Sequence, residues 1–118
     1  MMVSEQRQVA GELVSRTHEL AVSVAGVAPG DSYEVLADLR QSVDALAVVC
    51  ARFAVWHEQA GDGVEYVGED SDGDGATGTV VAAESLRRAA EELRVAALSL
   101  DAAHEASSVI RWRGNPQE

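Results

Sequence analysis

Three aspartates at alternate positions, Asp70, Asp72 and Asp74, are followed directly by a glycine. Alternate carboxylates in a tight turn can converge on one calcium ion, and this order matches the first half of a calcium loop. Val81 stands where a bidentate glutamate would close such a loop. Residues 69–75 therefore allow two interpretations. In one they bind calcium or a basic partner, and in the other they are part of a mobile acidic linker that holds no metal.

Arg52 and His57 are a second pair whose types could do chemistry, because a cation can hold a phosphate while a histidine moves a proton. Their spacing resembles the Arg-x4-His pattern of helical HEPN-type ribonucleases, in which a dimer places two such pairs around an RNA phosphate. The resemblance implies an alternative function as a helical ribonuclease with Arg52 and His57 as its catalytic residues. The other interpretation makes Arg52 the one solvated position on a buried helical turn.

Charge and composition exclude several classes of function. The net charge is −11, which opposes binding to nucleic acid because that affinity rests on cationic side chains that neutralise phosphates. No glycine loop precedes a lysine and no Gly-x-Ser-x-Gly turn is present, so we do not expect an enzyme, and we expect no cofactor. All nine basic residues are arginine, and alanine and valine are frequent, which we interpret as the composition of a G+C-rich bacterial genome.

Cellular location is judged from the N-terminus, the single Cys50 and the longest apolar run. The N-terminus has no signal-peptide pattern, Cys50 cannot form an internal disulfide, and residues 45–51 are too few to cross a bilayer. We therefore expect a cytoplasmic protein with no membrane partner.

The elements that must position these residues are three helices. Apolar residues recur at helical spacing over residues 4–27, with Ser4 as the N-cap and Pro29 ending the pattern. A second helix is expected over 32–60, opened by Asp31 and Glu34 as a capping pair.

This second helix has the strongest periodicity in the chain, a seam in alternating steps of three and four. Its members are Leu36, Leu39, Val43, Leu46, Cys50, Phe53 and His57. From Ala45 to Trp56 the only charged residue is Arg52, so this half of the helix is apolar on nearly every side. Such a helix is expected to be buried by other helices or by a second subunit. We expect Leu46, Val49 and Phe53 in the core, and an interface built from Leu39, Leu46, Val49, Phe53 and Trp56.

A third helix is expected over 80–112, with alanines repeating every seven residues along it and a charged outer face. The chain of 118 residues is then one domain, an all-α antiparallel three-helix bundle with a flexible acidic loop at 61–79 and a disordered tail at 114–118. Because three helices cover an all-round apolar helix poorly, we expect a homodimer that forms a larger helical bundle. The expected function is a small acidic protein-interaction or accessory module with a protein partner that the sequence does not identify.

Overall fold

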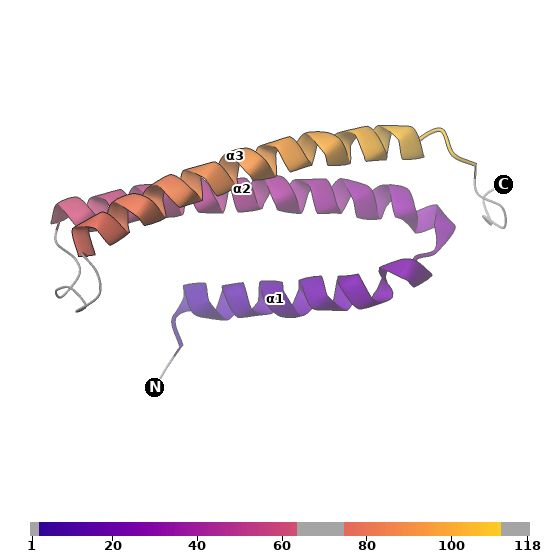
Figure 1. Ribbon diagram of the computed structural model, residues 1–118. Coiled ribbons are helices and arrows are strands. Elements are labelled where there is room, and N and C mark those ends of the chain that lie inside the picture. Colours follow the sequence, from indigo (N-terminus) through magenta and orange to yellow (C-terminus); the bar gives the residue numbers. More distant parts are fainter. Residues whose placement is uncertain (1–2, 64–74, 112–118) are drawn as a thin grey trace. The chain divides into compact units, whose positions relative to one another are not determined.

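The computed structural model describes residues 3–63 and 75–111, and no strand occurs among them. Three α-helices and two short 3-10 turns make up this part of the chain: α1 (Glu5–Ser23), η1 (Val24–Gly26), η2 (Pro29–Asp31), α2 (Ser32–Gly63) and α3 (Gly75–Ser107) (Figure 1). They fall into two compact units, one with α1 and the two turns and the other with residues 33–111. The all-α class and the three helices are confirmed.

Helix α1 begins where the sequence predicts. The Oγ of Ser4 accepts a hydrogen bond of 3.2 Å from the backbone N–H of Arg7, which satisfies one of the donors left free at a helix start. Its end comes earlier than predicted, because the last turn tightens into η1 at Val24 and the backbone is extended at Val27 and Ala28. Pro29 enforces that extension at Ala28.

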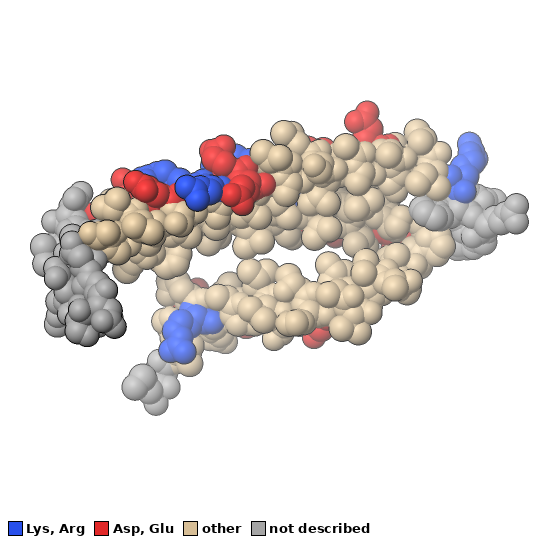
Figure 2. Space-filling model, viewed as in Figure 1, with Lys and Arg blue, Asp and Glu red and all other residues tan. Residues whose placement is uncertain are grey.

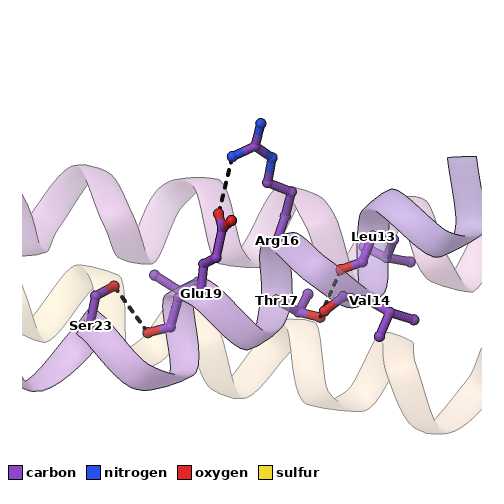
Figure 3. Close-up of polar contacts among 7 residues, drawn as sticks. Leu13, Val14, Arg16, Thr17, Glu19 and Ser23 are labelled. Atoms are coloured by element: carbon purple, nitrogen blue, oxygen red, sulfur yellow. Dashed lines mark hydrogen bonds and ion pairs between the residues drawn. The ribbon is translucent and has the colours of Figure 1, made fainter.

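Four polar side chains in the C-terminal half of α1, those of Arg16, Thr17, Glu19 and Ser23, bond within the helix itself (Figure 3). Thr17 Oγ1 donates to the carbonyl oxygen of Leu13 over 2.7 Å, and Arg16 Nη1 lies 3.0 Å from Glu19 Oε2. No residue of α1 is buried, and Leu13 and Leu20, the centre of its apolar stripe, are each more than a third exposed. The stripe predicted from the sequence is present and has an open face.

Asp31 and Glu34 stand at the positions predicted for them, immediately before α2 and in its first turn. Asp31 is the last residue of η2, its backbone N–H donates to the carbonyl of Ala28 over 2.8 Å, and α2 begins at Ser32. The connection between α1 and α2 is therefore a 3-10 turn, as short as the sequence predicts.

Helices α2 and α3 form an antiparallel hairpin and run side by side (Figure 1). Arg40, early in α2, pairs with Asp101, late in α3. Glu58, late in α2, pairs with Arg87, early in α3. Two cross-helix ion pairs in opposite order along the two helices fix the antiparallel direction.

The core of this hairpin consists of alanine. The buried hydrophobic residues among those described are Ala47, Ala54, Ala60, Ala83, Ala90 and Ala97. Five of them repeat at intervals of seven, which places them along one side of each helix. Small side chains on facing stripes let two helix backbones approach closely, so the contact is tight without any large buried side chain.

This alanine core corrects the core predicted from the sequence. Val49 is 56% exposed and Phe53 48% exposed, and Leu46 is only half-buried. Leu46 and Phe53 come one residue before the buried Ala47 and Ala54, about 100° around the helix from the contact, and Val49 lies about 160° away from it. Within one chain the alanine stripe faces α3, and the larger side chains lie beside it or behind it.

The helix ends near the acidic segment also differ from prediction. The loop was expected over 61–79, but α2 continues to Gly63 and α3 already begins at Gly75. Helix α3 ends at Ser107 instead of 112, where Val109 and Ile110 donate to carbonyls three residues back. The rest of the predicted loop and the tail at 114–118 lie outside the described residues. No helix in the described part of the chain is long and apolar enough to cross a membrane.

Candidate interaction surface

An aromatic cluster lies on α2 at Phe53, Trp56 and His57. The ring centroids are 5.6 Å apart for Phe53 and Trp56, 4.6 Å for Phe53 and His57, and 5.0 Å for Trp56 and His57. Steps of three and four residues bring side chains together on one helix, and the three rings meet at tilted or edge-on angles that aromatic pairs favour. The cluster forms a small aromatic surface on α2.

Around this cluster the outer side of α2 stays open. Five large apolar residues there are 45–56% exposed, and we name them the α2 apolar face: Val48, Val49, Phe53, Val55 and Trp56. Arg52 is the only charged residue between Ala45 and Trp56, and it too is exposed. Single exposed apolar residues are ordinary on a protein surface, whereas large exposed apolar patches are typical of interaction sites, so the α2 apolar face is a candidate for one.

The predicted interface residues divide between this face and its border. Val49, Phe53 and Trp56 belong to the α2 apolar face, whereas Leu39 and Leu46 are half-buried. Leu39, Leu46 and Phe53 recur every seven residues, so the two leucines lie in the same row of α2 as Phe53. Three of the five predicted interface residues are therefore exposed on the α2 apolar face, and the other two lie beside it and are half-buried.

Arg52 and His57, the residues of the ribonuclease alternative, are placed separately. His57 Nδ1–H donates to the carbonyl oxygen of Phe53 over 2.8 Å, which turns the ring back along its own helix and onto Phe53 and Trp56. Arg52 has no hydrogen bond or ion pair with any residue in the described ranges. The neighbours of His57 in the described ranges are therefore aromatic rings and a backbone carbonyl, and no contact between His57 and Arg52 is present there.

The calcium alternative falls on Asp70, Asp72 and Asp74, which lie outside the described residues, so it stays a prediction. Over residues 3–63 and 75–111, no group of three or more histidine, cysteine, aspartate or glutamate side chains could hold a metal ion. Cys50 is a free, half-buried thiol.

A polar cluster closes the hairpin at the end where α2 begins. The ring of Tyr33 stacks on that of His104, and Arg40 pairs with Asp101 and lies 3.5 Å from Asp44 Oδ2. His104 Nε2 is buried and has no hydrogen-bond partner in the described part of the chain. We name Tyr33, Arg40, Asp101 and His104 the polar end of the hairpin.

Beside the polar end is a hollow of about 180 Å³, lined by Ala37, Arg40, Gln41, Asp101 and His104. This volume is below that of an ordinary small-molecule pocket. Asp101 already forms an ion pair with the Arg40 guanidinium, so an anion bound there would lie beside a carboxylate. The hollow has room for water beside the buried His104 Nε2.

The polar end was not predicted from the sequence, although a signal for it exists. Counting back by seven from Ala54 and Ala47 gives Arg40 and then Tyr33, and counting forward from Ala97 gives His104. The alanine stripe therefore stops on both helices at the same end of the hairpin. The large side chains of Tyr33, Arg40 and His104 at these positions are the signal.

Charged side chains on the visible surface of the hairpin gather near the beginning of α3 (Figure 2). Arg87 pairs there with Glu58, and Arg94 Nη1 lies 2.6 Å from Glu91 Oε1. Both signs occur together and neutralise one another locally, which is the pattern of a solvated helix face and not of a site for one sign of charge.

No protein-family model, curated protein or solved structure matches this chain.

Proposed function

We propose that this chain is a small, acidic, non-catalytic interaction module of a bacterial system, that it acts in the cytoplasm through its helix faces, and that one of its partners is a second copy of itself. The observation that carries the proposal is the α2 apolar face. Phe53 and Trp56 are each about half exposed, and they lie among exposed valines with Arg52 as the only charge. Tryptophan and arginine are the residue types that most often dominate binding energy at protein interfaces.

Burying the exposed halves of Phe53 and Trp56 against another surface would be energetically favourable. A fully buried aromatic side chain removes about 150–250 Å² from water, so covering the open halves of Phe53 and Trp56 removes about 200 Å² per chain. Two copies remove about 400 Å² from these rings alone, worth about 10 kcal/mol before the cost of association. That cost is of similar size, so Val48, Val49 and Val55 must contribute for the dimer to be stable.

The wider architecture that we propose is one domain in which the three helices form an antiparallel bundle and two copies associate into a larger one. Two features support it. Helix α1 has an apolar stripe without a buried residue, and the α2–α3 hairpin has an apolar face on its outer side. Helices with an open apolar stripe gain most of their stability in proteins from packing that stripe against another element.

Sedimentation equilibrium over micromolar concentrations tests the proposal. The unmodified chain should show an average mass that rises from one chain toward two. Trp56→Ser together with Phe53→Ser should hold the mass at one chain, while circular dichroism stays that of a folded helical protein, because both side chains are half exposed. The matched control is Val95→Ser with Leu98→Ser, two residues of α3 that are 63% and 68% exposed and lie outside the face. The control should dimerise like the unmodified chain.

A single-chain mass at every concentration would refute self-association. Equal loss of mass in the control would show that general surface apolarity, and not the α2 apolar face, drives association.

A further inference from the structure

The polar end of the hairpin has a position that suggests a role in fixing how α2 and α3 align. Alanine repeats every seven residues on α3 at Ala83, Ala90 and Ala97, and on α2 at Ala47 and Ala54. Alanine presents the same small surface at each repeat, so after a shift of seven residues alanines would still face alanines, although one repeat of overlap would be lost. The alanines alone therefore discriminate weakly between the two alignments.

One direction of shift is opposed by charge. If each position on α2 met the α3 residue seven places lower, Arg40 would exchange Asp101 for Arg94. Glu58 would at the same time exchange Arg87 for Val80. Both cross-helix ion pairs would be lost, and two arginines would be brought together.

The other direction is opposed by size. If each position on α2 met the α3 residue seven places higher, His104 would enter the place of Ala97, which is only 4% exposed. An imidazole does not fit where the close contact admits a methyl group. In this direction Glu58 would still meet an arginine, Arg94, so charge alone would not prevent the shift.

We propose that the polar end is a register lock for the α2–α3 hairpin, with His104 as the steric stop in one direction and Arg40 as the electrostatic stop in the other. Tyr33 holds His104 in place by stacking on its ring, with centroids 3.8 Å apart and planes 16° from parallel. Opening the lock allows α3 to step along α2 by one heptad, a displacement of about 10 Å. Polar residues that interrupt an apolar helical seam are known to specify register in this way.

Spin-label distances within one chain test the lock. Labels at Asp38→Cys and Glu84→Cys are on exposed positions of α2 and α3, in a chain that carries Cys50→Ala. Labelled chains are diluted into excess unlabelled protein so that only distances within a chain are measured. The starting protein should give one distance. His104→Ala with Asp101→Asn should add a population that is longer by about 10 Å, because α3 moves toward higher-numbered contacts.

Two matched variants separate the lock from general destabilisation. His104→Phe keeps a ring of similar bulk over Tyr33 and should retain the single starting distance. Glu91→Gln removes an ion pair within α3 that does not reach α2, and should also leave the distance unchanged.

An unchanged single distance in His104→Ala with Asp101→Asn, at unchanged helix content, overturns the proposal. If that variant loses its helical signal, His104→Ala alone is decisive, because it keeps both cross-helix ion pairs. This single variant must then show a minor longer distance, and its absence also overturns the lock. The measurement is made within one chain, so its outcome is independent of self-association.

Discussion

The ring of Tyr33, at the start of α2, stacks on the ring of His104, near the end of α3. Tyr33→Ala removes this stack and should lower the free energy of unfolding by about 1 kcal/mol, a modest loss because Tyr33 is 39% exposed. Tyr33→Phe keeps the ring and should unfold like the unmodified chain. Urea titration at one fixed protein concentration measures both, and equal stability of the Ala and Phe variants would show that the stack contributes nothing.

The ion pair between Glu58 and Arg87 should make a small contribution, because both side chains are about half exposed. A double-mutant cycle with Glu58→Gln and Arg87→Gln should give a coupling free energy of about 0.5 kcal/mol, and molar salt should reduce it. Arg94→Gln with Glu91→Gln is the matched cycle for a pair within one helix. A coupling that does not change with salt would indicate that Glu58 and Arg87 interact by packing and not by charge.

The alanine core should not accept larger side chains. Ala54 and Ala90 are 0% and 2% exposed, so Ala54→Leu or Ala90→Leu forces the two helices apart and should lower the free energy of unfolding by about 2–3 kcal/mol. Ala96→Leu is the control, because Ala96 has the same helix propensity but is exposed. Urea unfolding followed by circular dichroism distinguishes them. Comparable stability of Ala90→Leu and Ala96→Leu would contradict a close-packed alanine contact.

Helix α1 should depend on its N-cap more than a well-buried helix would, because it has no buried residue. Ser4→Ala removes the acceptor for the Arg7 N–H and should cost about 1 kcal/mol of local helix stability, seen as fraying of residues 5–8 in NMR chemical shifts. Ser4→Asp should keep the helix, since aspartate caps as well as serine. Similar shifts for the Ala and Asp variants would show that the cap is not what holds the first turn.

Much of this architecture follows from local signals in the sequence. Ser4 starts a helix for reasons that lie within a few residues of it, and the structure places that start as predicted. The stop before Pro29 is also local, although α1 already ends at Ser23. The alanine repeat on α3 is visible as two adjacent rows, and the sequence does not say which row is buried. The structure buries the row of Ala83, Ala90 and Ala97.

The features that were missed depend on contacts between α2 and α3. Glycines near residues 61–63 and 75–78 each disfavour helix by about 1 kcal/mol, yet α2 and α3 extend through them, next to the buried Ala60 and Ala83. The periodicity of α2 predicted a core at Val49 and Phe53, because periodicity reports which side is apolar and not which side meets another helix within one chain.

Isotope-filtered NMR on an equal mixture of labelled and unlabelled chains tests most directly whether a second copy covers the α2 apolar face. Nuclear Overhauser effects between chains should join the ring protons of Phe53 or Trp56 in one copy to the methyl groups of Val49 in the other. If a sample with the mass of a dimer gives no such contacts from these rings, or if the chain has the mass of a monomer at millimolar concentration, self-association through this face is contradicted.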